Sequence, residues 1–269
     1  LIVALINASA EPVTIFLSGP CTNLAQALRL DPGIRENIAS VYIMGGAVYV
    51  RGNIDDIISD TGNTVAEWNI YADPQAAREV FDAGIAIYLV PLDATNQVSV
   101  TRQETAQWRL GGRIADFAAD IYDSLLDNWG TENAAVWDLM TATIMVKPNL
   151  CGFEALNLRV VTEDGATSGQ TKLVSNMPPN TSVCLKPDVT LIKQTMIEIF
   201  SSKPAAQVAT PEPVSTSTTA LLRVASVTPQ SLIFRDDFSD GPMAAAGAFR
   251  QLLRLPAGGA GSIELRPGR

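Results

Sequence analysis

The sequence of 269 residues contains no histidine, three cysteines and few charged residues, which make up 17% of the chain. Without histidine, the chain lacks the usual proton shuttle near neutral pH and the usual ligand of zinc. Acid–base chemistry would therefore fall to carboxylates or water, and a bound metal should be a hard cation held by oxygen. Because Cys21, Cys151 and Cys184 are few and scattered, we expect small buried residues rather than a metal–thiolate site or a disulfide framework.

The chain also lacks an excess of positive charge and a long apolar run. Its net charge is −9, so no basic surface is expected that could neutralise the phosphates of a nucleic acid polymer. No apolar stretch approaches the roughly 20 residues that cross a bilayer, and no membrane span is predicted. Hydrophobic residues make up 47% of the chain, which is enough for one large core and a small additional region.

Short apolar runs alternate with segments of helical periodicity in the first half of the chain. Strand-like runs and helical segments follow one another at 13–17, 22–30, 40–44, 73–83, 85–90, 101–108 and 113–126. This alternation predicts an α/β fold with a mostly parallel, open, doubly wound sheet and helices on both faces. Ligands of such sheets bind beyond the carboxyl ends of the strands. Ser18, Met44 and Leu92 lie at such ends, so three loops are expected to form one site.

The pattern changes after the first half of the chain. A core helix is predicted at 137–146, followed by a hairpin of 156–161 and 172–175 that ends the sheet-forming part of the domain. A closing helix is predicted at 189–200.

Three regions follow from these patterns. We assign 1–200 to one domain and 201–224 to a linker rich in serine, threonine and proline. Residues 232–238 resemble the opening strand of a β-sandwich, so 225–269 is assigned to a truncated fragment of such a domain. The linker composition is typical of exported multidomain proteins, which favours export or the cell envelope, with the cytoplasm as the alternative. The sequence begins at Leu1 without a methionine or a signal peptide, so its start says nothing about export.

The segment Ala-Glu-Trp-Asn-Ile-Tyr-Ala-Asp-Pro at 66–74 is the most informative motif. On an extended stretch, Glu67 and Asn69 would project to one face, and a carboxylate beside an amide suits neighbouring hydroxyl groups. Asp73 and Pro74 are typical of the N-cap and first turn of a helix. The motif therefore predicts a sugar-binding loop ahead of a rigid helix.

Several motifs occur in a specific order: Ser18–Ala25, Met44–Ala47, Glu67–Asn69, Asp73–Ala77, Pro91–Thr95 and Trp137-Asp138. Together they resemble the inosine-uridine-preferring nucleoside hydrolase family from residue 1 to about residue 200. The resemblance implies an N-glycosidase that splits ribonucleosides into free base and ribose with the help of calcium. It also implies a nucleoside hydrolase-like α/β fold, a nucleoside as the partner, and a homo-oligomer.

The resemblance assigns substrate contacts to four kinds of residue. Glu67 and Asn69 would bind the ribose hydroxyls, and Met44 would touch the sugar. A second asparagine would reach the 5′-hydroxyl, and both Asn53 and Asn63 are candidates; Asn53 is preferred because it follows Met44 at the expected distance. The alternative is structural: a polar loop capped by its own side chains and a methionine that fills the core.

The resemblance also assigns calcium ligands, namely the carboxylate of Asp138 and the backbone carbonyl of Ser18. An ordinary helix-terminal charge is the alternative for Asp138. The two donors cannot fill a calcium shell. Family members begin with a strand and an aspartate-rich loop that supplies the other ligands and the base. The resemblance therefore predicts an N-terminal truncation, and no residue of this chain is assigned as nucleophile or general base.

Trp137 stands where well-known members carry a histidine that protonates the leaving base. Tryptophan has no titratable proton, so we expect the base to be activated by stacking on Trp137 or Trp68, with a leaning towards purines. The alternative for Trp137 is an indole packed against the sheet. Two other functions stay open: a ribose-binding or sugar-binding module without catalysis, and hydrolysis of a related riboside such as nicotinamide riboside.

Overall fold

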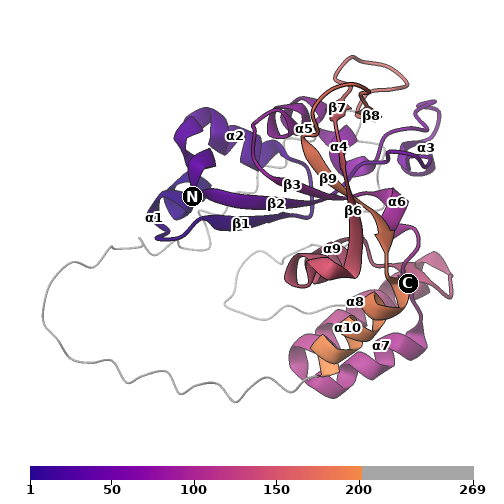
Figure 1. Ribbon diagram of the computed structural model, residues 1–269. Coiled ribbons are helices and arrows are strands. Elements are labelled where there is room, and N and C mark those ends of the chain that lie inside the picture. Colours follow the sequence, from indigo (N-terminus) through magenta and orange to yellow (C-terminus); the bar gives the residue numbers. More distant parts are fainter. Residues whose placement is uncertain (202–269) are drawn as a thin grey trace, which may run out of the picture. The chain divides into compact units, whose positions relative to one another are not determined.

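The computed structural model describes Leu1–Ser201. The predicted linker, apart from Ser201, and the predicted β-sandwich fragment lie outside the described residues. A five-stranded sheet forms the centre of the fold, in the order β1-β2-β3-β9-β6 (Figure 1). Its strands are β1 (Val13–Leu17), β2 (Ile38–Met44), β3 (Ile87–Val90), β9 (Thr181–Pro187) and β6 (Cys151–Leu156). All pairs are parallel except β6 with β9.

Alternation along the strands divides the core into two layers, one on each face of the sheet. Val41 and Ile43 of β2 belong to a cluster that also contains residues of the helices α1 (Ile2–Ala8), α2 (Thr22–Leu30) and α5 (Pro74–Phe81). Tyr42 of the same strand faces the opposite cluster, formed with α7 (Arg102–Trp108), α8 (Arg113–Trp129), α9 (Trp137–Val146) and α10 (Val189–Ser201). The predicted α/β class, with helices on both faces of a mostly parallel sheet, is confirmed.

Shorter elements connect this framework. They are η1 (Pro32–Asn37), α3 (Ile54–Ile57), α4 (Trp68–Ala72), α6 (Leu92–Thr95), β4 (Ser99–Val100), η2 (Arg109–Gly111), β5 (Ala134–Ala135), η3 (Pro148–Leu150), β7 (Leu158–Val160) and β8 (Thr171–Leu173). The antiparallel pair β7–β8 is the hairpin that the sequence predicts. Within the part of the chain that the structure describes, every helix is too short or too polar to cross a bilayer.

The sequence predicted that the hairpin ends the sheet-forming part of the domain, and this prediction was wrong. After β8 the chain returns to the central sheet as β9, between β3 and β6. Within the predicted strand 156–161, Leu156 is the last residue of β6 and 158–160 form β7, because the chain leaves the central sheet at Asn157. An antiparallel edge strand and a returning central strand are both set by long-range pairing, which local periodicity cannot show.

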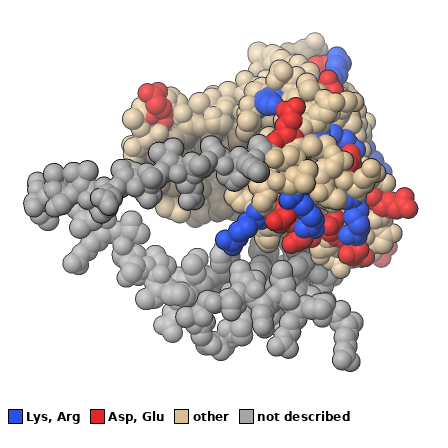
Figure 2. Space-filling model, turned by 90° about the horizontal axis from the view of Figure 1, so that it is seen from below, with Lys and Arg blue, Asp and Glu red and all other residues tan. Residues whose placement is uncertain are grey.

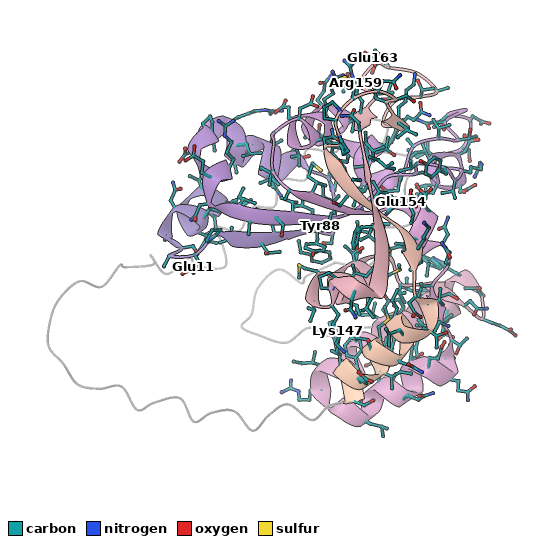
Figure 3. All side chains as sticks on the ribbon, in the orientation of Figure 1. Glu11, Tyr88, Lys147, Glu154, Arg159 and Glu163 are labelled. Atoms are coloured by element: carbon teal, nitrogen blue, oxygen red, sulfur yellow. A yellow bond between two sulfur atoms is a disulfide. The ribbon has the colours of Figure 1, made fainter. Side chains whose placement is uncertain are left out.

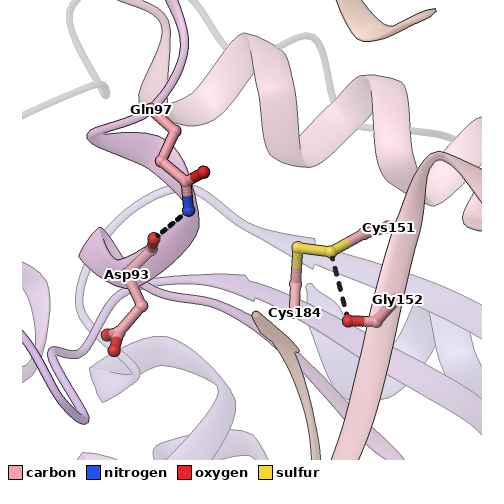
Figure 4. The surroundings of a disulfide bond; sticks show 5 residues. All are labelled: Asp93, Gln97, Cys151, Gly152 and Cys184. Atoms are coloured by element: carbon pink, nitrogen blue, oxygen red, sulfur yellow. Dashed lines mark hydrogen bonds between the residues drawn. A yellow bond between two sulfur atoms is a disulfide. The ribbon is translucent and has the colours of Figure 1, made fainter. Parts of the chain in front are cut away.

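Two of the three cysteines form a disulfide, so the expectation of isolated buried residues was wrong for them. Cys151 begins β6 and Cys184 lies within β9, and the antiparallel pairing brings their Cα atoms to 5.8 Å (Figure 4). The partners are separated by 33 residues in sequence, and only the strand pairing makes them neighbours. Cys21 is free and buried, as expected, and burial raises the pKa of its thiol to about 12.

An aromatic row crosses the sheet on the side of α9. Tyr42 of β2 stacks on Tyr88 of β3 with ring centroids 4.7 Å apart, and Phe153 of β6 meets the edge of Tyr88 at 5.3 Å. Tyr88 points from the sheet into this layer (Figure 3). Such pairs add to the burial energy of the layer.

Candidate functional site

The carboxyl ends of three neighbouring strands bring the predicted loops together. Leu17 pairs with Ile43, and Met44 pairs with Val90, so the strands β1, β2 and β3 end at one edge of the sheet. Ser18 follows β1 directly and is exposed. The sequence places the loops correctly because parallel neighbours must end on the same side.

Glu67 is the most constrained side chain at this edge. It is 2% exposed and acts as the N-cap of α4, where its carboxylate accepts the backbone N–H groups of Asn69 and Ile70. The same carboxylate accepts the N–H of Gly46 at 3.0 Å and so ties the loop after β2 to α4. The sequence predicted an extended stretch here, but the segment begins a helix instead. Glu67 makes this possible because it satisfies the free N–H groups of the first helical turn.

The environment of Glu67 shifts its protonation equilibrium. Burial raises the pKa of its carboxyl from 4.5 to about 7, against the opposing effect of the three backbone donors. The charge of Asp138 raises this pKa further, so the site places the two carboxylates within electrostatic reach of each other. Oε2 accepts from Gly46, Asn69 and Ile70, whereas Oε1 accepts only from Asn69. Oε1 therefore keeps capacity for a proton or for a hydroxyl donor.

Asn69 is oriented by the end of β2. Its Nδ2 donates to the carbonyl of Met44 at 3.1 Å and to the Met44 sulfur at 3.4 Å. Among the described residues, nothing donates to Oδ1 of Asn69, so this oxygen is free to accept from a ligand. Met44 is 3% exposed and packs in a small cluster with Ala47, Leu92 and Trp137.

The structure separates the two candidate asparagines. Asn53 is half-buried, and its Oδ1 accepts the N–H of Trp68 at 2.9 Å, which places it beside the Glu67–Asn69 motif. Asn63 is fully buried and stabilises the segment before Glu67. Its Oδ1 accepts the N–H of Ala66 at 3.0 Å, and its Nδ2 donates to the carbonyl of Ser168 at 2.8 Å. The chain between the two asparagines loops out through α3 and returns, which explains the long sequence gap before Glu67.

The two predicted calcium donors, Asp138 and Ser18, are both exposed, but two donors are too few to hold the ion. Asp138 lies in the first turn of α9, makes no hydrogen bond with the described residues, and has a carboxyl pKa that partial desolvation raises. Within Leu1–Ser201, no group of three or more acidic or cysteine side chains is arranged to hold a metal ion. Calcium takes six to eight oxygen ligands. The described residues therefore do not by themselves form a calcium site.

Trp129 is a candidate that the sequence interpretation missed. It ends α8, is 53% exposed, and meets Trp137 at the start of α9 with ring centroids 6.0 Å apart. Trp137 packs against the Met44 cluster, so the indole pair lies near the end of β2. An exposed tryptophan eight residues before Trp137 was the available signal, but the turn between α8 and α9 hides the contact in sequence.

Asp93 belongs to the Pro91–Thr95 motif, and the structure shows its role. Its carboxylate accepts the N–H groups of Val48 and Tyr49, both at 2.8 Å. The carbonyl of Asp93, which lies within α6, accepts from Gln97 Nε2 at 2.7 Å just past the end of that helix (Figure 4). Asp93 thus fixes the loop after Met44 from one side while Glu67 fixes it from the other. Gly46 has φ of +84°, so the turn between these anchors needs glycine.

Comparison with known proteins identifies the family of this chain. The family model described as "Inosine-uridine preferring nucleoside hydrolase" matches residues 1–194. The Pyrimidine-specific ribonucleoside hydrolase RihA of Escherichia coli (strain UMN026) is 32% identical over 205 residues, which cover 72% of this chain and 62% of that protein. The protein of the same name from Salmonella newport is 32% identical over 213 residues, covering 76% and 64%. The chain thus spans less than two thirds of these relatives.

Solved structures give the same result. The purine-preferring ribonucleoside hydrolase from Gardnerella vaginalis superimposes with a TM-score of 0.64 at 27% identity, covering 74% of this chain and 64% of that chain. The inosine-uridine preferring nucleoside hydrolase from Bacillus anthracis superimposes with a TM-score of 0.64 at 26% identity, covering 74% and 63%.

Proposed function

The chain belongs to the inosine-uridine preferring nucleoside hydrolase family, and from this membership we propose that the protein hydrolyses the N-glycosidic bond of ribonucleosides to free base and ribose. One observation carries the proposal beyond the family. The loop after β2 is clamped by Glu67 and Asp93 on either side, beside an amide oxygen and an aromatic pair that are available to a ligand. Such a fixed loop holds a ribose in one orientation without further ordering cost.

The ribose contacts follow from the unused polar atoms. Nδ2 of Asn69 is held by Met44, so Oδ1 would accept a ribose hydroxyl. Oδ1 of Asn53 is held by Trp68, so Nδ2 would donate to the 5′-hydroxyl. Glu67 would add an acceptor at Oε1. Asn63 is proposed to support the loop from its buried position rather than to meet the substrate.

The nucleobase would lie against Trp137 and Trp129. Stacking of a base on an aromatic side chain is worth about 1 to 3 kcal/mol in other proteins, and a purine offers the larger surface. The two curated relatives are named as pyrimidine-specific, whereas one solved structure is named as purine-preferring. The indole pair favours purines in this protein.

Calcium is proposed as the cofactor, with Asp138 and the carbonyl of Ser18 as the donors that this part of the chain contributes. The other oxygen ligands and the base for water would come from outside the described residues. When bound, the cation would orient ribose hydroxyls and lower the pKa of water. What the described residues do themselves is bind the sugar, orient it and cover one side of the base.

Export is proposed as well. The buried Cys151–Cys184 disulfide is typical of oxidising compartments, which agrees with the serine- and proline-rich composition after residue 200. Self-association into a homo-oligomer is also proposed, and the exposed side of α8 offers a surface for it.

The experiment is release of ribose from inosine, adenosine, guanosine, uridine and cytidine by the full-length protein, with calcium and with a chelator. We expect chelator-sensitive release, faster with purines, and a kcat/KM reduced about 10- to 100-fold by Asn69→Ala. The matched control is Asn7→Ala, because Asn7 lies on α1 and pairs with Asp31 away from the strand ends. Absence of release by a folded protein that retains ribose binding would favour the sugar-binding module.

A further inference from the structure

Within the described chain, the indole pair has no side chain assigned to protonate a leaving base. The sequence contains no histidine, and the N–H of the Trp137 indole does not titrate. Asp138, directly after Trp137, is the proposed calcium donor. Glu67 is 2% exposed and holds the N–H of Gly46 in the loop after β2, and its carboxylate is assigned to the sugar. The pair thus offers a base an aromatic surface without an acid.

Trp129 presents the accessible face of the pair. It ends α8 and is 53% exposed, and its ring meets that of Trp137 at 6.0 Å with an angle of 60° between the two planes. Trp137 is less exposed and packs against the cluster of Met44, Ala47 and Leu92. Among aromatic side chains, indole attracts a cation most strongly, because the face of its ring is negative.

The segment that carries the two indoles has acidic residues and no basic ones. From Ile114 to Val146 the sequence contains six acidic residues and neither lysine nor arginine. Three of the six pair with arginines of α7 and η2, but Glu132, in the turn after Trp129, is exposed and forms no ion pair with any described residue. Figure 2 shows acidic and basic side chains interspersed on the side where α7, α8 and α10 lie. A positive charge at the indoles would therefore be attracted, and the net charge of −9 adds to this attraction.

The charge of the base decides whether its departure needs an acid. Cleavage of the N-glycosidic bond leaves the electron pair of that bond on the base nitrogen, so a neutral base leaves as an anion unless it receives a proton. A base with a fixed positive charge leaves as a neutral molecule, because the electron pair cancels the charge. Water supplies the oxygen on C1′ in both cases, and with the cationic base one proton is released to solvent. Such a substrate needs no general acid.

We propose that the protein prefers ribosides whose base carries a positive charge, namely N7-alkylated purines and N-ribosylated pyridines, and that Trp129 and Trp137 bind the charged ring. This preference rests on the proposed function, the hydrolysis of ribonucleosides, and specifies its substrate class. The positive charge draws the base onto the indoles in the bound substrate and disappears from the ring as the bond breaks. The indoles therefore act mainly on KM, whereas the better leaving group acts on kcat.

The first test compares cationic with neutral ribosides by release of ribose from the full-length protein with calcium. 7-Methylguanosine is compared with guanosine, and nicotinamide riboside with uridine, in mildly acidic buffer that keeps the methylated base cationic. We expect kcat/KM for each cationic riboside to be at least about 100-fold higher, since general acid catalysis of a neutral base is worth that much. Ratios near one, with ribose released from guanosine, would overturn the preference and leave the proposed hydrolysis standing.

A variant separates recognition of the charge from the chemical lability of cationic ribosides. Trp129→Leu keeps an apolar side chain but removes the aromatic face, so KM for 7-methylguanosine should rise at least about threefold more than KM for guanosine. The matched control is Phe117→Leu, because Phe117 is an aromatic residue of the same helix that is 62% exposed, and it should change neither value. An equal rise in KM for both nucleosides would overturn the role of the indoles.

A binding measurement tests the same preference without catalysis. 7,9-Dimethylguanine is cationic in mildly acidic buffer, and its isomer 8,9-dimethylguanine is neutral, so the two differ in charge at equal size. Titration followed by tryptophan fluorescence should show the cation binding at least about threefold more tightly, and this difference should disappear in Trp129→Leu. Equal affinities in the wild type would overturn the preference even if no nucleoside were hydrolysed.

Discussion

The carboxylate of Glu67 accepts the backbone N–H of Gly46 at 3.0 Å across 21 residues of sequence. One side chain thus caps a helix and closes the loop that follows β2. Because the carboxylate is buried, its protonation state becomes part of the stability of the site.

Stability should fall between about pH 4.5 and 7 because of Glu67. The folded protein binds this proton more tightly than the unfolded chain, since burial raises the pKa from 4.5 to about 7. The contribution is therefore fully present below pH 4.5 and is lost as the pH rises through 7, on the order of 3 kcal/mol in total. Urea unfolding at several pH values should show this slope in the wild type and a flatter profile in Glu67→Gln. Glu36→Gln at an exposed position is the control; an equal flattening there would contradict the assignment.

Asp93 should matter for both folding and activity. Asp93→Ala removes the acceptor of two N–H groups, those of Val48 and Tyr49, and should cost on the order of 2 kcal/mol of stability. Because the freed loop lies between Met44 and Asn53, two of the proposed substrate contacts, kcat/KM for ribose release should fall more than about tenfold. Asp93→Asn keeps one acceptor and should lie between. Equal kcat/KM in the alanine variant and the wild type would show that the loop holds its position without Asp93.

The indole pair should set base preference. Trp129→Ala should lower kcat/KM for inosine and guanosine about 5- to 100-fold, the range for one stacking contact, and affect uridine less. Trp129→Phe should restore most of the loss, since it keeps an aromatic face near Trp137. A parallel drop for purines and pyrimidines would instead assign Trp129 to packing of the turn between α8 and α9.

The disulfide should be a strong contributor to stability. Opening the bond between Cys151 and Cys184, which closes a loop of 33 residues, should cost about 3 to 4 kcal/mol if the unfolded chain gains the expected entropy. Thermal unfolding with and without reductant measures this, and the double variant Cys151→Ala with Cys184→Ala should match the reduced protein. A reductant-sensitive Tm in that double variant would point to another bond. Thiol labelling of the protein from its native compartment tests export independently.

The cap at Asp73 should give a smaller effect. Its carboxylate accepts the N–H of Ala76 at 3.0 Å and the hydroxyl of Thr22 at 2.6 Å, joining α5 to α2. Asp73→Ala should therefore lower the free energy of unfolding by about 1 to 2 kcal/mol. Asp73→Asn should lose less, because asparagine is also a good cap. Equal losses in the two variants would mean that the charge rather than the cap stabilises this corner.

Local physics in the sequence was enough for most of the framework. The apolar runs and helical spacings predicted β1, β2, β3, the major helices and the β7–β8 hairpin, because each depends on residues close in sequence. Asp73 and Pro74 marked the start of α5 for the same reason. The ordered motifs then indicated the family and placed three loops at one edge of the sheet.

Contacts between distant segments decided the rest. The return of β9 to the central sheet, the Cys151–Cys184 bond and the meeting of Trp129 with Trp137 all join residues that periodicity treats separately. The role of Glu67 was also hidden, because a carboxylate two positions before an asparagine suits an extended loop until tertiary packing buries it as a helix cap. The sequence by itself determined the class of fold and the family. Only the tertiary structure decided which polar atoms form hydrogen bonds within the loops and which remain available to a ligand, because that depends on burial and on partners distant in sequence.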